Sequence, residues 1–273
     1  MTTTPPPAAK TNTRQEPDLT ALVVAHRAIC RDLRRLTACL SGIAARGVPS
    51  SRADAICRYT AALLAGIRSH LDDEEHIVWP VIAAAAGAAV DLTPLADDHE
   101  AIRAVASRAS RTAAAVRTDP DALAELHAPI DELRDMLDEH IADEEAQIFP
   151  AMRRYLPYEV YRWCEKQMRR TSSLSSRRFA APWLARYARP DEQSRLLANG
   201  GWPARIVLAA ARPGYVRLER RAFGATSADD NTQEKGTNNA VLPGNRADAL
   251  DRAASATSAG AERDQGHVRG CGR

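Results

Sequence analysis

Apolar residues recur every three or four positions in four long segments of the chain, and this spacing predicts four amphipathic helices. Short connections between helices of this length are typical of an up-down-up-down four-helix bundle, which we expect over residues 17–155. The predicted helices span residues 18–46, a segment from Ser50 or Ser51 that weakens at Pro80 and ends near Gly87, residues 93–117, and a segment with a kink or restart at Pro129 and a break near Pro150.

The rest of the chain differs from these four segments in composition. Residues 1–16 and 225–273 contain almost no large apolar side chains, so we predict disordered tails there. Residues 156–224 form a predicted basic helical extension, with helices over 158–170, 174–188 and 203–211. Together these patterns predict an all-α fold.

Composition excludes several classes of protein. No apolar run reaches the roughly 20 residues that cross a bilayer, and the N-terminus lacks the apolar core of a secretion signal, so we expect no membrane partner and a cytoplasmic location. Five cysteines, an odd number without a CxxC pair, indicate neither a disulfide framework nor a zinc ribbon.

Polar residues interrupt the apolar stripes at six positions where burial is costly unless the side chains are paired. The segment from His70 to Pro80 resembles the segment from His140 to Pro150 in its histidine, its Asp-Glu-Glu triplet, its apolar-aromatic pair and its proline. A single helical histidine precedes each copy. The six residues are His26, His70, Glu74, His99, His140 and Glu144.

Helix geometry predicts that these six side chains meet. Residues four apart lie about 40° from one another on a helix, so each histidine of the repeat points the same way as the glutamate four positions later. Residues equidistant from a turn lie at one level in antiparallel helices, and the midpoints of the pairs fall in the predicted turns. We therefore expect one layer of four imidazoles and two carboxylates. His76 and His127 are rotated away from it by about 120° and 140°.

Four imidazoles and two carboxylates match a centre of two metal ions, in which the glutamates bridge and the histidines are terminal ligands. Nitrogen and oxygen ligands without a thiolate suit iron or manganese, with zinc also possible. Six side chains do not saturate two six-coordinate ions. An open position for water, dioxygen or another small ligand follows.

The pattern H, HxxxE, H, HxxxE on a four-helix bundle resembles the hemerythrin family, specifically the hemerythrin-like HHE cation-binding domains of bacteria. The resemblance covers residues 17–155 and implies that the six residues bind a non-haem di-iron centre with a bridging oxygen species. Oxygen-carrying hemerythrins have a further histidine four residues after the third-helix histidine, where this chain has Arg103, and an aspartate where it has Glu144. The resemblance therefore favours reactivity with peroxide, nitric oxide or oxygen over reversible oxygen carriage.

Three functions remain open at this point. The first is a di-iron protein that binds or reduces dioxygen, peroxide or nitric oxide, which would make it a peroxide- or nitric-oxide-consuming oxidoreductase if it turns over. The second is an iron or oxidant sensor or store that signals through the basic extension. The third is a bundle with a structural zinc or manganese ion, although iron is favoured over both.

Other polar residues near the layer have weaker expectations. Asp73 and Asp143 lie about 60° from the ligand face, so each is expected either to hydrogen-bond a ligand imidazole or to be a surface charge. Glu75 and Glu145, about 140° away, are expected to be solvated. Gln147 is expected to point inward near the site. Met136 is interpreted as a core residue, and Cys30 as either a small apolar core residue or a redox-active residue near the metals. Tyr59 lies about 16 Å from His70 along the helix, too far to bind the same ions.

Charge is distributed unevenly between the bundle and the extension. Residues 17–150 hold 13 basic and 22 acidic side chains, whereas residues 151–224 hold 16 basic and 5 acidic ones. We expect the extension to pack on the acidic bundle by charge complementarity. The alternative is a surface for nucleic acid or another anionic partner, although no nucleic-acid motif supports it. Its candidates are Arg169, Arg170, Arg177, Arg178, Arg220 and Arg221.

Overall fold

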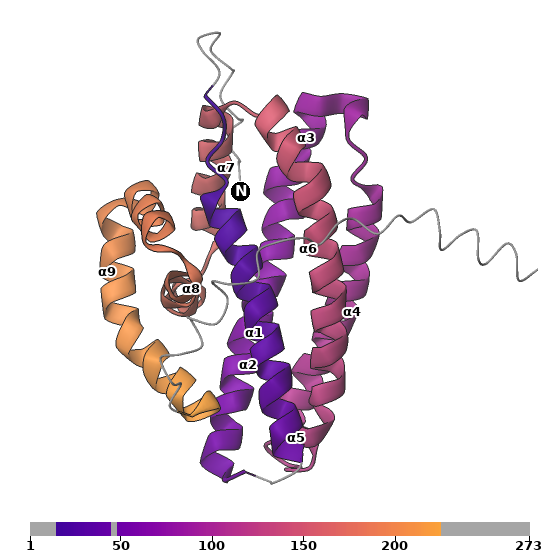
Figure 1. Cartoon of the computed structure of the whole chain (residues 1–273), viewed down its shortest axis with the longest axis vertical. Helices are drawn as coiled ribbons and strands as arrows, with labels where there is room; N and C mark the ends of the chain where they lie inside the picture. Colours follow the sequence, from indigo (N-terminus) through magenta and orange to yellow (C-terminus); the bar gives the residue numbers. More distant parts are fainter. Residues whose placement is uncertain (1–14, 45–47, 225–273) are drawn as a thin grey trace, which may run out of the picture. The chain divides into compact units, whose positions relative to one another are not determined.

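In the computed structural model, residues 15–44 and 48–224 are described, and every regular element among them is helical. The all-α prediction is therefore confirmed. Four antiparallel helices form the bundle (Figure 1). They are α1 (Thr20–Ala44), α2 (Ser50–Asp73), α4 (Thr93–Ala115) and α6 (His127–Tyr155). The predicted disordered tails fall outside the described residues except at 15 and 16, and the predicted domain boundaries stay predictions.

Apolar stripes on these helices form the bundle core. α1 packs against α6, α6 against α4, and α4 against α2. The buried positions follow helical spacing, as in Leu33, Leu36 and Leu40 on α1 and Leu63 and Ile67 on α2. None of the described helices is long and apolar enough to cross a membrane.

The prolines affect the helices less than the sequence predicts. The predicted break near Pro150 is wrong, because α6 continues through it to Tyr155. Proline frees one carbonyl group, that of Ala146, and this segment of α6 is exposed, so water can satisfy the carbonyl. The predicted restart at Pro129 is confirmed, because a short helix ends at Glu125 and α6 begins at His127, which puts Pro129 in the first turn, where a missing N–H costs little.

The second helix of the bundle changes its winding where it carries a predicted ligand. After α2 comes a π-helical segment, Glu74–Val78, and then α3 (Trp79–Ala86) with Pro80 in its first turn. π-helical turns are rare and often lie at functional sites. A 3-10 turn, Gly87–Ala89, follows, and Gly87 has a φ of 57°, which favours glycine. The short helix α5 (Ala122–Glu125) precedes α6.

Three helices form the extension, which packs on α1 and α2 (Figure 1). Two of them match the prediction closely. The third has two segments that meet at a kink at Gly201: the second contains the predicted helix over 203–211 and continues to Phe223, whereas the first, which begins at Pro190, was not predicted. The earlier start has a sequence signal, because Pro190 is the first helical residue and Glu192 accepts a hydrogen bond from the Arg189 N–H at 2.8 Å. The helices are α7 (Tyr158–Thr171), α8 (Leu174–Tyr187) and α9 (Pro190–Phe223), which kinks at Gly201.

A buried aspartate on α1 joins the bundle to the extension. Asp32 is fully buried, and its carboxylate accepts hydrogen bonds from Tyr59 Oη at 2.6 Å, from Trp183 Nε1 at 2.6 Å and from Tyr187 Oη. Tyr215 of α9 lies 3.0 Å from Tyr59, oxygen to oxygen. Burial raises the pKa of Asp32, and the three hydrogen bonds act in the opposite direction.

The ion pairs between bundle and extension have the opposite polarity to the one expected from net charge. Arg27 of α1 donates two hydrogen bonds to Glu192 of α9, at 2.6 and 2.9 Å, and Arg35 donates one to Glu219 at 2.6 Å. In these described pairs, arginines of the acidic bundle bind glutamates of the basic extension. Docking therefore uses individual partners, and most arginines of the extension stay exposed.

Replacing Asp32 by alanine is expected to lower the free energy of unfolding by about 3 kcal/mol, because three buried donors lose their acceptor. Chemical denaturation followed by near-UV circular dichroism, which reports on Trp183, measures the loss. Asp54→Ala, at an exposed position of α2, is the control and should change stability by less than about 0.5 kcal/mol. Equal effects in the two variants would contradict the role of Asp32.

The pair between Arg27 and Glu192 predicts a pH dependence. The hydrogen bond from Arg27 lowers the pKa of Glu192 from 4.5 to about 2. A lowered pKa contributes stability above the ordinary value that is lost as pH falls toward the folded value. Glu192→Gln should therefore be less stable than the parent chain at pH 7, and this gap should close between pH 4.5 and 2. A gap that persists at pH 2, or an equal gap for exposed Glu159→Gln, would argue against the pair.

Candidate metal centre

The structure brings the six predicted side chains together in one buried layer, near the middle of the bundle. His26 comes from α1, His99 from α4, and His140 and Glu144 from α6, whereas His70 lies in the last turn of α2 and Glu74 begins the π-helical segment. Five of the six residues are at most 2% exposed, and the side chain of His70 is 12% exposed. Helical periodicity and turn positions thus predict their meeting correctly.

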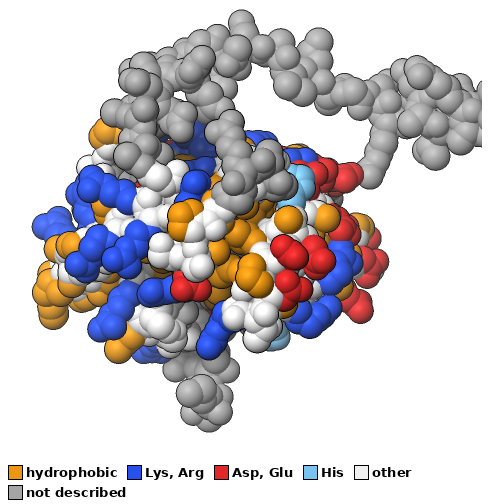
Figure 2. Space-filling model, turned by 90° about the horizontal axis from the view of Figure 1, so that it is seen from below, with side chains coloured by type: hydrophobic (Ala, Val, Ile, Leu, Met, Phe, Trp, Pro, Cys, Tyr) orange, Lys and Arg blue, Asp and Glu red, His pale blue; other side chains and the backbone are white. Residues whose placement is uncertain are grey.

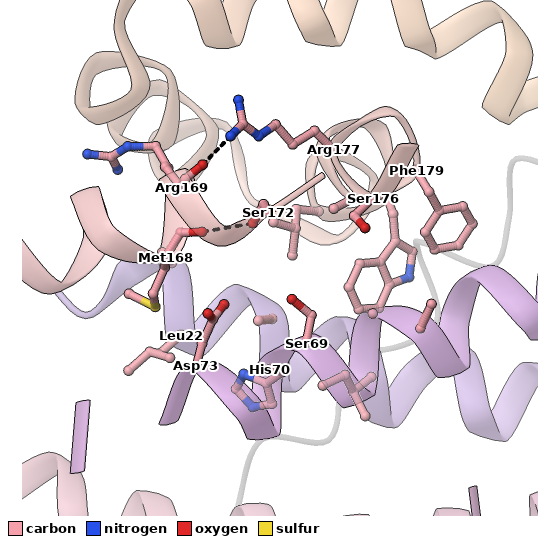
Figure 3. Close-up of a pocket in the computed structure, with 18 of the residues that line it drawn as sticks. Leu22, Ser69, His70, Asp73, Met168, Arg169, Ser172, Ser176, Arg177 and Phe179 are labelled. Atoms are coloured by element: carbon pink, nitrogen blue, oxygen red, sulfur yellow. Dashed lines mark hydrogen bonds between the residues drawn. The ribbon is translucent and has the colours of Figure 1, made fainter. Parts of the chain in front are cut away.

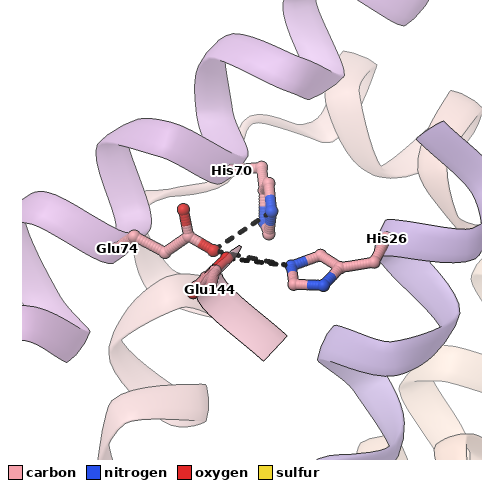
Figure 4. Close-up of side chains that lie close together, drawn as sticks. All are labelled: His26, His70, Glu74 and Glu144. Carbon is pink, nitrogen blue, oxygen red and sulfur yellow. Dashed lines mark ion pairs between the residues drawn. The ribbon is translucent and has the colours of Figure 1, made fainter. Parts of the chain in front are cut away.

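The six residues form two groups of metal-ligand type that share one carboxylate. The first group contains His26, His70, Glu74 and Glu144 (Figure 4). The second contains Glu74, His99 and His140. Glu74 Oε1 lies 3.1 Å from His70 Nε2, and its Oε2 lies 3.5 Å from His99 Nε2. Glu74 is therefore placed to bridge two ions.

Glu144 is placed differently from Glu74. Its Oε2 lies 3.3 Å from His26 Nε2, and it belongs to the first group alone. The prediction that both glutamates bridge is thus matched by the geometry of Glu74 only. The two sites are unequal, with four protein side chains around one and three around the other.

Several atoms of the layer are buried polar groups without hydrogen-bond partners. They are His26 Nε2, His70 Nε2, both carboxylate oxygens of Glu74, and Glu144 Oε2. Such groups are rare in proteins because each loses its hydration without compensation. All of them belong to the first group, and a cation among them would be a partner for every one.

The two imidazoles of the second group also favour a bound cation. Nε2 of His99 and Nε2 of His140 are 3.0 Å apart. His99 Nδ1 donates to Glu75 at 2.9 Å, and His140 Nδ1 lies 3.5 Å from Asp98, so in the neutral rings both Nε2 atoms carry lone pairs. Two facing lone pairs repel, and a cation bound to both removes the repulsion. The residues therefore fit a two-ion centre.

Two glutamates expected to be solvated instead support ligand imidazoles. Glu75 accepts from His99 Nδ1, and Glu145 accepts from His26 Nδ1, each at 2.9 Å. The prediction compared the direction of each glutamate only with the ligand face of its own helix. About 100° of rotation separates adjacent helical residues, which turns each of these side chains toward the neighbouring helix, where the histidine lies. Carboxylates in this position fix the ring orientation and raise the basicity of a ligating nitrogen.

The three other residues considered near the layer do not contact the ligands. Asp73 faces α7, where Thr171 Oγ1 donates to it at 3.3 Å. Asp143 has no described contact with a ligand imidazole. Gln147, expected to point inward, is exposed, because apolar Ile148 and Phe149 occupy the buried side of this turn. Burying the amide would require partners that this face does not offer.

The aromatic residue of each repeat stacks on a histidine of the other half of the chain. The ring of Trp79 lies 4.4 Å from that of His99, and the ring of Phe149 lies 5.4 Å from that of His26, centroid to centroid. Both pairs are close to parallel. The aromatic rings exclude water from one face of each imidazole, which strengthens electrostatic interactions within the layer.

Arg103, which stands four residues after His99, supports the centre indirectly. Its guanidinium donates to both carboxylate oxygens of Glu75, at 2.7 and 2.9 Å, and to Asp72 at 3.0 Å. Glu75 in turn holds His99. Arg103 thus fixes a carboxylate that orients an imidazole.

The remaining candidates lie apart from the centre, as expected. His76 Nδ1 donates to the Asp72 carbonyl at 2.8 Å, and His127 Nε2 contacts Ser41 Oγ at 2.7 Å at the far end of the bundle. Cys30 and Met136 pack against the core. Burial and the hydrogen bond to Asp138 raise the pKa of the Cys30 thiol to about 12, so the thiol is neutral.

Protons compete with cations for this layer. Burial lowers the pKa of His70 to about 3, and burial together with the charge of Glu144 raises the pKa of Glu74 to about 8. Burial alone raises the pKa of Glu144, but the positive charge of His26, whose Nε2 lies 3.3 Å from Glu144 Oε2, outweighs burial and lowers that pKa. A cation would replace the proton on Glu74.

Comparison with known families agrees with this geometry. The model of the hemerythrin HHE cation-binding domain matches residues 18–152 and again residues 95–170, which together span more than half of the chain. The chain belongs to the hemerythrin HHE cation-binding family. The comparisons with curated proteins and with solved structures found no match. Members of this family are cation-binding domains, and the buried histidines and glutamates form two groups that could hold metal ions.

The supporting carboxylates predict a graded effect on metal affinity. Glu145→Gln and Glu75→Gln keep the side-chain shape but remove the charge behind a ligand imidazole, so each should weaken metal binding about 10- to 100-fold. Competition with a chromophoric chelator measures the affinity. Glu139→Gln, at an exposed position of α6, is the control and should bind metal like the parent chain. Unchanged affinity in both test variants would refute the supporting role.

Proposed function

We propose that this hemerythrin-like domain binds two iron ions through His26, His70, Glu74, His99, His140 and Glu144, and that the centre binds or reduces dioxygen, peroxide or nitric oxide. The main support is the sharing of Glu74 by two groups of buried ligand atoms. A structural ion needs one closed group of ligands, whereas a shared carboxylate places two ions side by side.

The donor set suits iron and argues against a structural zinc ion. Imidazole nitrogen and carboxylate oxygen without thiolate suit iron, manganese and zinc, and unequal ligand numbers leave positions for an exchangeable small molecule. Structural zinc sites have four protein ligands in a closed tetrahedron, and the group of three side chains does not supply them. A di-iron centre contributes redox chemistry toward small oxidants.

The residues of this chain would orient and insulate such a centre. Glu75 and Glu145 hold the rings of His99 and His26, while Trp79 and Phe149 cover them. Arg103 occupies the position of the further histidine in oxygen carriers and binds Glu75 instead. This arrangement leaves the second group one ligand short, which favours reaction with an oxidant over reversible carriage.

A sensor of iron or oxidants is the second candidate, and one contact favours it. Arg27 directly follows His26 in the sequence and donates hydrogen bonds to Glu192 and to the Tyr187 carbonyl at 3.1 Å. A ligand of the centre is thereby adjacent to a residue that holds α9. A change in the position of His26 would therefore change the contacts of Arg27 with the extension. The exposed arginines of the extension give that region a basic surface (Figure 2). A nucleic-acid or protein partner for this surface stays a prediction.

Metal analysis of variants tests the proposal. The parent chain purified from iron-supplemented cells should carry two irons and a visible absorption spectrum typical of ferric iron. Glu74→Ala should lose both ions because its carboxylate is shared, and Glu144→Ala should lose at least one, whereas His127→Ala should keep both. Equal loss in Glu74→Ala and His127→Ala would mean that the ligands are assigned wrongly.

A turnover assay separates the two candidates. With ascorbate as electron donor, sustained consumption of peroxide or nitric oxide would favour the oxidoreductase. A single stoichiometric reaction, together with a metal-dependent change in the circular dichroism of Trp183, would favour the sensor. A protein that binds zinc alone, without a visible spectrum, would contradict both.

A further inference from the structure

A cavity of about 440 Å³ lies between the bundle and the extension, beside the metal centre. One wall is built by α1 and α2, and the opposite wall by α7 and α8 (Figure 3). Its volume is within the range of sites that bind small organic molecules, and apolar side chains dominate its lining. A second cavity of about 330 Å³ shares part of this lining and continues toward α9.

Small residues on one wall create the space. Ala25, Ala62 and Gly66 line the cavity where larger side chains would close the gap between bundle and extension. A Cβ atom on Gly66 would meet nothing within 4 Å. Glycine within a helix costs about 1 kcal/mol relative to alanine, and packing does not require a glycine at position 66. The residues chosen by this sequence therefore keep the space open.

Two arginines at the junction of the cavities have no carboxylate of the described residues within ion-pair distance, although the charge of Glu165 attracts Arg169. Arg169 and Arg177 line both cavities, and neither forms an ion pair with a carboxylate of the described residues. Arg177 donates to the carbonyl of Arg169, and its Nε is buried without an acceptor. Glu165 also lines the junction, but its carboxylate accepts from Arg162 at 2.9 Å. The junction therefore has an excess of positive charge, whereas the other carboxylate of the cavity, Asp73, lies beside His70 (Figure 3).

The cavity also reaches the metal centre. His70 lines it, and this is the predicted ligand with the largest exposed fraction. Carboxylates stand next to Nδ1 of the other three histidines, whereas Nδ1 of His70 has no hydrogen bond to a described residue. His70 is thus the ligand whose outer edge opens on the cavity (Figure 3).

We propose that this cavity binds a single-chain amphiphile of the fatty-acid class, with its carboxylate on Arg177 and Arg169 and its alkyl chain along Ala25, Ala62 and Gly66 toward His70. The guanidinium fork matches a carboxylate in geometry and charge. The hydroxyl groups of Ser172 and Ser176 stand on the same wall (Figure 3). The inference goes beyond the proposed chemistry of the centre and holds for whichever metal it carries.

Calorimetric titration of the full chain with dodecanoate, below its micelle concentration, tests the proposal without any activity assay. Binding should be saturable, with one molecule per chain, both with iron and after chelation. Dodecanol has the same chain without the charge and should bind at least tenfold more weakly, because a hydrogen-bonded ion pair to arginine is lost. Absence of saturable binding, or equal affinity for both compounds, would overturn the proposal.

Two pairs of variants locate the site. Gly66→Leu fills the chamber and should reduce dodecanoate affinity at least tenfold, whereas Gly42→Leu, at an exposed position of α1 with nothing within 4 Å of its Cβ, should not. Arg177→Gln should weaken dodecanoate about 10- to 100-fold and leave dodecanol unchanged. Arg178→Gln, exposed on the same helix, is its control.

Each variant is first checked for helix content and thermal midpoint. Undiminished binding by folded Gly66→Leu or Arg177→Gln would place the amphiphile elsewhere and refute the assignment. Should Gly66→Leu fail to fold, the comparison of dodecanoate with dodecanol on the parent chain and on Arg177→Gln decides the question.

Discussion

Two carboxylates buried in the middle of an apolar bundle are the constraint on which this structure depends. Glu74 and Glu144 are both 1% exposed, and their charges repel. An uncompensated buried charge costs several kcal/mol, so the layer is stable only when positive charge enters it. Protons supply part of that charge, because the raised pKa values of Glu74 and His26 favour the protonated forms of both side chains. Five buried atoms of the layer still have no hydrogen-bond partner. Cations bound in the layer would satisfy all of these atoms at once.

Each copy of the duplicated motif supports the leading histidine of the other half of the chain. The first copy supplies Glu74 as a shared ligand, and its Glu75 and Trp79 then support His99 of the second half. The second copy supplies Glu144, while Glu145 and Phe149 support His26 of the first half. For each leading histidine, the carboxylate at Nδ1 and the stacked aromatic ring come from the other half of the chain. This mutual support makes the centre a property of the assembled bundle, so that ligand geometry forms only when both helical pairs have packed.

Much of the centre could be predicted from the sequence because its ligands follow from local rules. Spacing of four residues along a helix and equal distances from a turn are both fixed by helix geometry, and they place all six side chains correctly. The roles of Glu75 and Glu145 escaped this reasoning, because their partners lie on neighbouring helices at sequence distances of 24 and 119 residues. The repeat itself contained the signal, since the second glutamate and the aromatic residue recur in both copies without a role on their own helix.

Contacts between the bundle and the extension could not be predicted from helix spacing and turn positions. Asp32 of α1 is 27 residues from Tyr59 of α2, and its donors on α8 lie more than 150 residues away, so their meeting depends on how the extension folds back. Net charge predicted the docking partner but not the polarity of the ion pairs, because summed charge does not determine which side chains are buried together. The π-helical segment could not be predicted from local rules either, because these assume regular α-helical winding and the winding changes locally at Glu74.

Helix α1 links the metal centre to the extension through its two faces. One face presents His26 to the centre, and the other presents Arg27, Asp32 and Arg35 to α8 and α9. The cavity lies on the same boundary, between α1, α2 and the extension, with His70 in its wall. A molecule that separates or tightens this boundary acts on α1 and therefore on His26, and a change at His26 acts in return on the contacts that line the cavity. Because coupling between two sites is reciprocal, the occupant of the cavity and the ions of the centre must influence each other's binding if either one shifts α1.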